Sequence, residues 1–134
     1  METLPYDTDI EDVVLGGIIQ NIEEYDLVSK YFIEKDVFYQ KRAKLLWEKI
    51  TTMKKEGKHI DTLTMCSSLT QEDTDNGLTQ YYITKCTTSS GAKGTAEFYT
   101  AQIYEKYLLR KVIVQSEKVK NKAMSNEKDV YDSI

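Results

Sequence analysis

The segment from Thr95 to Met124 contains neither proline nor glycine, and it constrains the fold more than any other part of the chain. The segment predicts one helix of about 30 residues, or about 45 Å at ~1.5 Å per residue. Its middle, residues 107–114, is apolar on more than one side, because Tyr107 and Val114 lie opposite a broad side made of Leu108, Leu109, Val112 and Ile113. A helix that packs on a single core needs only one apolar stripe. We therefore expect one side to face its own domain and the other to face a partner or a further helix.

The rest of the chain predicts shorter helices, because its only proline is Pro5 and its apolar residues recur at helical spacing. Helices are expected at about 8–20, 22–31, 40–56, 62–69 and from 78 to about 86, with a turn at 33–36, a polar loop at 71–77 and a flexible loop at 88–94. The expected inward residues are Ile10, Val13, Val14, Gly17, Ile18, Ile22, Tyr25, Val28, Phe32, Ala43, Leu46, Trp47, Ile50, Met53, Leu78, Tyr81, Tyr82 and Cys86.

The fold class expected is all-α. Residues 1–94 should form a compact helical bundle, and residues 95–134 should add, within the same domain, the long helix and the start of a hairpin. The second hairpin helix should begin near Ser125 or Asn126, and the chain ends inside it at Ile134.

Residues suited to catalysis or metal binding are scarce. His59 is the single histidine and is expected in solvent, and Cys66 and Cys86 form no CxxC motif, so two reduced thiols are expected. GAKG at 91–94 lacks the spacing of a phosphate-binding loop. We expect no catalytic, cofactor or metal site, and therefore no enzyme activity from this chain alone.

Charge patterning argues against broad binding to nucleic acid, because 22 acidic residues outnumber 18 basic ones. The acidic pairs Glu23–Glu24 and Glu72–Asp73 are expected on solvated surfaces. The same is expected of the basic residues of the long helix, with a phosphate-contacting stripe as the weaker alternative: Lys106, Arg110, Lys111, Lys118, Lys120 and Lys122. The N-terminus lacks the apolar region of a signal peptide, and no apolar run is long enough to span a membrane, so a cytoplasmic protein is expected.

Three stretches together resemble the N-terminal domain of bacterial replicative DNA helicases of the DnaB family. The first, residues 9–19, matches the family's opening helix at Glu11, Val14, Leu15 and Gly16. The second, residues 36–65, matches at Phe38, Tyr39, Gly57, Ile60, Asp61 and Thr64. The third, residues 98–113, matches at Tyr99, Ala101, Ile103, Lys106, Leu108, Arg110 and Ile113. The sequence departs from the family at Asn76-Gly77, where two glycines are usual, and the C-terminal ATPase domain is absent from this chain.

The resemblance implies a collar domain that pairs with other subunits in a hexameric ring. It also implies docking of the primase C-terminal domain or a helicase loader, and single-stranded DNA passing through the ring. ATP and magnesium would belong to the motor domain of the parent protein, which would unwind duplex DNA, and no membrane partner is implied. On the long helix we assign subunit pairing to Tyr104, Leu108, Val112 and Val119.

Two alternatives remain open. The chain could be a stand-alone phage or plasmid protein that mimics the collar and acts as a helicase loader or decoy. A generic helical DNA-binding domain is weaker, because the chain is acidic and lacks a basic recognition helix.

The adjacent Gly16 and Gly17 lie inside the apolar run VVLGGII, where each should cost a helix roughly 0.5–1 kcal/mol relative to alanine. Close approach of another helix would offset this cost through dispersion contacts. We assign close packing to Gly16 and leave Gly17 undecided, because related domains often carry alanine there.

Overall fold

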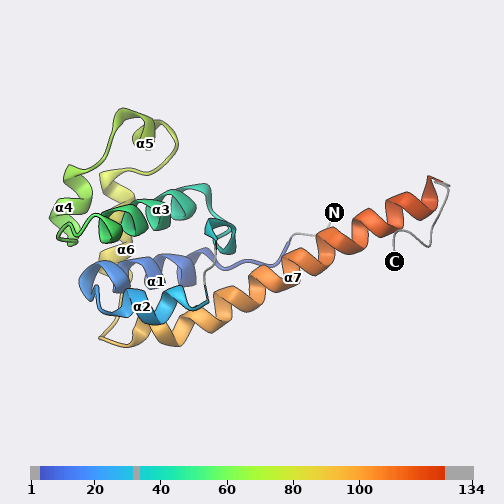
Figure 1. Ribbon diagram of the computed structural model, residues 1–134, viewed down its shortest axis with the longest axis horizontal. Coiled ribbons are helices and arrows are strands. Elements are labelled where there is room, and N and C mark those ends of the chain that lie inside the picture. The colour runs from blue at the N-terminus through green and yellow to red at the C-terminus, as the bar shows by residue number, and fades with distance from the viewer. Residues whose placement is uncertain (1–3, 32–33, 126–134) are drawn as a thin grey trace.

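The computed structural model of the protein describes residues 4–31 and 34–125, and the regular elements in these ranges are all helices. In chain order they are α1 (Thr8–Gln20), α2 (Glu24–Ser29), the 3-10 helix η1 (Lys35–Val37), α3 (Lys41–Lys55), α4 (Thr62–Ser67), α5 (Gln71–Asp75), α6 (Gln80–Ser89) and α7 (Thr95–Met124). The expected all-α fold is confirmed. The first six α-helices form a bundle, and α7 runs along it and then well beyond it (Figure 1).

Helix α1 is the centre of the bundle and packs against α3, α6 and α7. Val14, Leu15, Ile18 and Ile19 are all buried, whereas Val13 is only half-buried. The buried residues of α1 therefore cover more of its surface than the single inward face expected from the sequence, because helices surround α1 on several sides. Its N-terminus is capped by Asp7, whose carboxylate accepts a hydrogen bond from the amide of Ile10 at 3.0 Å.

Helix α3 agrees closely with the apolar spacing read from the sequence. Its buried residues are the five expected ones: Ala43, Leu46, Trp47, Ile50 and Met53. Gly57 follows the helix with a φ of 70°, the left-handed conformation that ends many helices.

The polar stretch at 71–77, expected to be a loop, contains the short helix α5. The reason is a capping box, in which the Thr70 hydroxyl accepts from the amide of Asp73 and the Asp73 carboxylate accepts from the amide of Thr70. These two bonds satisfy amides that an uncapped helix would leave open. Asp73 is also only partly exposed, because it forms a 2.8 Å ion pair with Lys49 of α3.

Helix α6 presents Tyr82 and Cys86 to the core, and Leu78 is buried just before it. The expected burial of Tyr81 is wrong, since 74% of its side chain is exposed. Neighbouring residues on a helix point about 100° apart, so Tyr81 and Tyr82 cannot both face α1.

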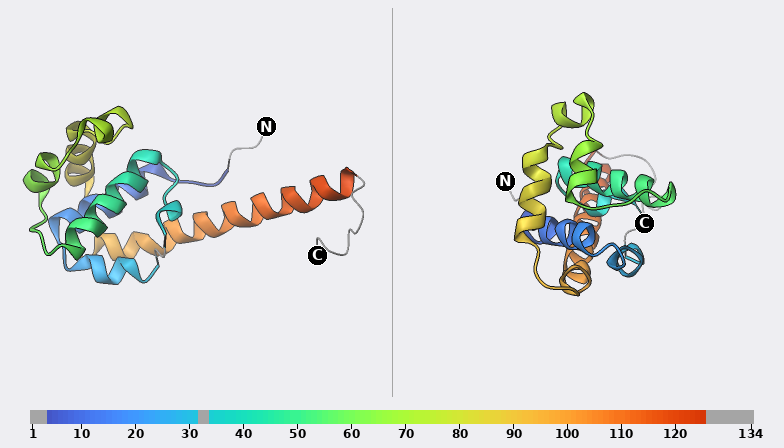
Figure 2. Two further views of the ribbon diagram at one scale, coloured as in Figure 1. Left: turned by 45° about the horizontal axis from the view of Figure 1, so that its top comes forward. Right: turned by 90° about the vertical axis from the view of Figure 1, so that its left-hand side faces the viewer.

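Helix α7 has two halves with different surroundings. Residues Ala96, Thr100, Ile103, Tyr107 and Arg110 are buried against the bundle. From residue 111 to residue 125 every residue is exposed, and this part of α7, which we call the arm, extends away from the bundle (Figure 2). The expected second hairpin helix, apart from Ser125, and the expected inward Phe32 lie outside the described residues.

Candidate interaction surface

From Leu108 onward, helix α7 carries exposed apolar side chains on more than one side. Their exposed fractions run from 38% to 74%, and the residues are Leu108, Leu109, Val112, Ile113, Val114, Val119 and Met124. Exposed apolar side chains that gather on one surface are typical of interaction sites.

Three of the four residues predicted for subunit pairing lie together on this surface. At about 100° per residue, Leu108, Val112 and Val119 fall within about 40° of one another around the helix axis. We call them the outer stripe. Tyr104, four residues before Leu108, is instead partly buried against the core, with its ring centroid 6.1 Å from that of Tyr31 and 5.9 Å from that of Tyr107.

Arg110 marks the point where α7 leaves the bundle. Its guanidinium donates hydrogen bonds to the carbonyl oxygens of Pro5 at 3.0 Å, Asp36 at 3.3 Å and Val37 at 2.8 Å. It also lies 5.5 Å from the ring centroid of Tyr39. Burial lowers the pKa of Arg110, but an arginine stays charged in proteins. Arg110 therefore ties α7 to both the N-terminal segment and η1, and the expectation that it is solvated is wrong.

A groove of about 710 Å³ lies beside Arg110, between α7 and the segment around η1. Leu4, Tyr39 and Val114 supply its apolar surface above the buried Phe38, and Lys111 and Lys118 lie along its α7 wall. The opposite wall includes Glu34, which accepts a hydrogen bond from the Tyr107 hydroxyl, and that bond raises the pKa of Tyr107.

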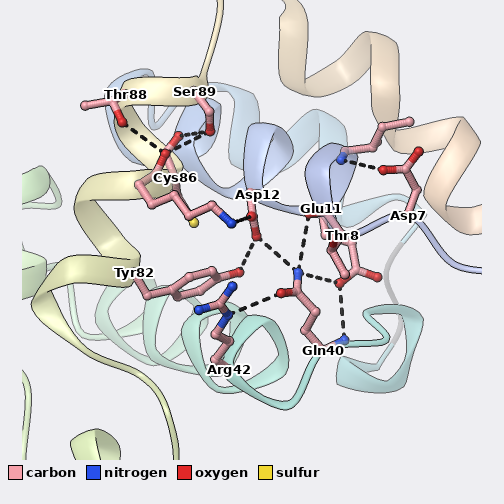
Figure 3. Close-up of polar contacts among 12 residues, drawn as sticks. Asp7, Thr8, Glu11, Asp12, Gln40, Arg42, Tyr82, Cys86, Thr88 and Ser89 are labelled. Carbon is pink, nitrogen blue, oxygen red and sulfur yellow. Dashed lines mark hydrogen bonds and ion pairs between the residues drawn. The ribbon is translucent and has the colours of Figure 1, made fainter.

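A polar network lies inside the bundle, centred on Glu11 of α1 (Figure 3). The Glu11 carboxylate accepts hydrogen bonds from the backbone amides of Tyr39 at 2.7 Å and Gln40 at 3.2 Å. These amides lie just before α3, so Glu11 fixes the start of that helix on α1. Burial raises the pKa of Glu11, and these hydrogen bonds oppose the shift.

The network continues through Asp12, which is 1% exposed. Its carboxylate accepts from the Tyr82 hydroxyl at 2.7 Å and from the Gln40 side-chain amide at 3.1 Å, and it pairs with Lys85 at 3.1 Å. These contacts join α1, α3 and α6. Burial also raises the pKa of Cys86 to about 12, so this thiol stays protonated and unreactive at neutral pH.

Sequence reasoning missed the buried charged residues. The spacing of apolar residues gave no sign that Glu11 or Asp12 is buried, and Glu24 was expected on a solvated surface. Glu24 is only 2% exposed, and its carboxylate accepts from the amide of Gly94 at 3.1 Å, which joins α2 to the start of α7. Only one signal in the sequence pointed to any of these buried charges: Glu11 and Arg110 both match the family pattern.

None of the described residues form a group of three or more His, Cys, Asp or Glu placed to hold a metal ion. His59 is exposed and contacts only Asp61 among the hydrogen bonds found, at 2.9 Å. Among the described helices, no segment combines the length and the apolar composition needed to cross a membrane.

The comparison with family models decides the identity of the fold. The model of the DnaB-like helicase N-terminal domain matches residues 3–105. The chain belongs to this family. It is accordingly an N-terminal domain of the replicative helicase type. The comparison with curated proteins gave no match.

Solved structures support the DnaB-like fold. The N-terminal domain of DnaB helicase from Mycobacterium tuberculosis superposes with a TM-score of 0.87, over 97% of this chain and 94% of that one. The two sequences are 20% identical, so the likeness shows a common fold. The superposition includes most of the arm, which lies beyond the segment that the family model matches.

Proposed function

We propose that this chain is the collar domain of a replicative DNA helicase, and that the outer stripe of α7 pairs with the outer stripe of a second copy. One observation carries the proposal: Leu108, Val112 and Val119 are exposed on the side of α7 that faces away from its own bundle. Burying a leucine or valine side chain stabilises an association by about 1.5–3 kcal/mol. A pair related by a twofold axis would bury the same stripe on both copies.

The collar proposal extends to the remaining partners. The pairs would assemble into a hexameric ring that admits single-stranded DNA, and the primase C-terminal domain or a helicase loader would dock on the collar. ATP and magnesium would act in the motor domain of the parent protein, in the cytoplasm. A stand-alone collar mimic that acts as a loader or decoy would use the same fold. Sequencing the gene beyond Ile134 distinguishes the two, because only the helicase would continue into the ATP-binding motif GxxxxGK[ST].

Sedimentation velocity over a range of protein concentrations tests the pairing. The double variant Leu108→Glu/Val112→Glu should remain folded, because both side chains are exposed, and should lose self-association. A matched control, Lys106→Gln/Lys120→Gln, makes the same change in net charge about 80–160° around α7 from Leu108 and Val112, so its self-association should resemble the wild type. The proposal fails if the wild type is monomeric at every concentration, or if both variants associate as the wild type does.

A further inference from the structure

We propose that the groove at the root of the arm binds an acidic amphipathic helix of a partner protein. The inference rests on the proposed collar function and names the docking site and the chemistry of its partner. The groove is separate from the outer stripe, because Lys111 and Lys118 lie about 60–120° around α7 from Leu108 and Val112. A partner could therefore occupy the groove while two copies pair through the stripe.

The shape and apolar surface of the groove fit side chains of a helix. Its volume of about 710 Å³ falls within the range of ordinary ligand sites. Phe38 is fully buried beneath it, while Tyr39 and Val114 remain 40% and 43% exposed and can be covered by a partner. Helix-in-groove binding uses apolar anchors of this kind.

The charges of the groove select an acidic partner. Across the described residues, Lys111 and Lys118 form no ion pair, and Lys111 lies 5.3 Å from the ring centroid of Tyr107. On the acidic wall, Glu34 accepts a hydrogen bond from Tyr107, and Asp36 pairs with Lys44 at 3.4 Å. Lys111 and Lys118 are seven residues apart, which places them about 10 Å apart along one side of the helix. Two carboxylates separated by two turns on a partner helix would meet them.

The same charges disfavour a nucleic-acid strand. A phosphate backbone carries negative charge along its whole length and would meet Glu34 and Asp36 as well as the lysines. A helix can place carboxylates toward α7 and apolar side chains toward Tyr39 and Val114. The observations therefore favour a peptide over single-stranded DNA.

The experiment is a selection from a random 16-residue peptide library displayed on phage, with the intact chain as the target. Enriched peptides should combine acidic residues with aliphatic or aromatic residues at helical spacing. As synthetic peptides, they should bind Lys111→Glu/Lys118→Glu at least about tenfold more weakly than wild type. The control Lys106→Glu/Lys120→Glu makes the same charge change on another side of α7 and should change binding less than about twofold.

Other outcomes overturn the proposal. It fails if no peptide is enriched, if the enriched peptides are basic, or if they bind the Lys111→Glu/Lys118→Glu variant as tightly as the wild type. It also fails if oligo(dT) binds the wild type and this variant alone loses it, which would make the groove a nucleic-acid site. If the same variant abolishes self-association in sedimentation, the groove is a contact between copies.

The pairing proposal and the groove proposal can fail independently. The Leu108→Glu/Val112→Glu variant should still bind the selected peptides, since both changes lie outside the groove. Loss of self-association with retained peptide binding supports both proposals. A monomeric wild type that still binds acidic peptides would reject only the pairing.

Discussion

Gly16 lies so close to the carbonyl oxygen of Cys86 that a methyl group cannot fit between α1 and α6. A Cβ at Gly16 would overlap that carbonyl and would approach the amide nitrogen of Thr87 to 3.0 Å. Both are backbone atoms of a packed helix and cannot rotate aside. The two helices therefore touch through their backbones at this point, and close packing offsets the cost of glycine in a helix.

Substituting Gly16→Ala should destabilise the domain by about 2–4 kcal/mol, because the overlap outweighs a gain in helix propensity of up to about 1 kcal/mol. Urea unfolding measures the change. Gly17→Ala is the comparison: its Cβ would lie 3.0 Å from the Cβ of Ala96, a side-chain contact, so its loss should be smaller and should be relieved by adding Ala96→Gly. Equal stability of Gly16→Ala and the wild type would contradict the backbone contact.

Arg110→Met should cost about 2–4 kcal/mol and should release the segments that Arg110 holds, because the carbonyls of Pro5, Asp36 and Val37 lose their donor. Hydrogen exchange of peptides covering residues 34–39 should speed up. Arg110→Lys should restore only part of the protection, since one ammonium cannot reproduce the forked guanidinium. The exposed Lys120→Met is the control, and exchange as slow in Arg110→Met as in this control would refute the role.

Tyr82→Phe should lower the free energy of unfolding by about 1.5–3 kcal/mol, because it removes the buried hydroxyl that donates to Asp12 at 2.7 Å. Thermal or urea unfolding measures the loss. The neighbouring Tyr81 offers a matched control: it is 74% exposed, so Tyr81→Phe should change stability by less than about 0.5 kcal/mol. Similar effects from the two substitutions would argue against the Tyr82–Asp12 bond.

Glu11→Gln should destabilise the domain by about 1–3 kcal/mol, because an amide at this site would direct an N–H donor toward the backbone N–H of Tyr39 or Gln40. The loss is measured by urea unfolding at neutral pH. Glu72→Gln, on the exposed surface of α5, controls for removal of one negative charge. A stability unchanged by Glu11→Gln would show that the carboxylate is not needed at the start of α3.

The stability contributed by Glu11 should also depend on pH. Burial raises its pKa in the folded domain, so the native state keeps a proton that the unfolded chain has released. The proton-linked part of that contribution is complete below the ordinary glutamate pKa of about 4.3 and is lost as pH rises through the raised value, which leaves the part that comes from the hydrogen bonds. The stability of the wild type relative to Glu11→Gln should therefore fall as pH rises from the ordinary glutamate pKa of about 4.3 through the raised value. A relative stability that rises with pH would mean that the hydrogen bonds outweigh burial.

Local patterns in the sequence predicted most helices well. The spacing of apolar residues predicted the five inward residues of α3, and the absence of proline and glycine predicted the uninterrupted length of α7. Both signals act within one or two turns of a helix. The resemblance to DnaB-family domains added the family, which the family model confirms. Helix α5 was missed because its capping box was read only as a polar turn.

The sequence by itself determined that the chain is helical, that its longest helix has more apolar surface than one core needs, and that no common catalytic motif is present. Only the tertiary structure decided which charged residues are buried. Four charged residues are buried although their sequence neighbours give no sign of it: Glu11, Asp12, Glu24 and Arg110. Each of them bonds to partners that lie far away in the sequence. Arg110, for example, bonds to Pro5 and Val37. A buried charge is stable only when its hydrogen-bond partners are already in place, and these partners meet only after the helices have packed.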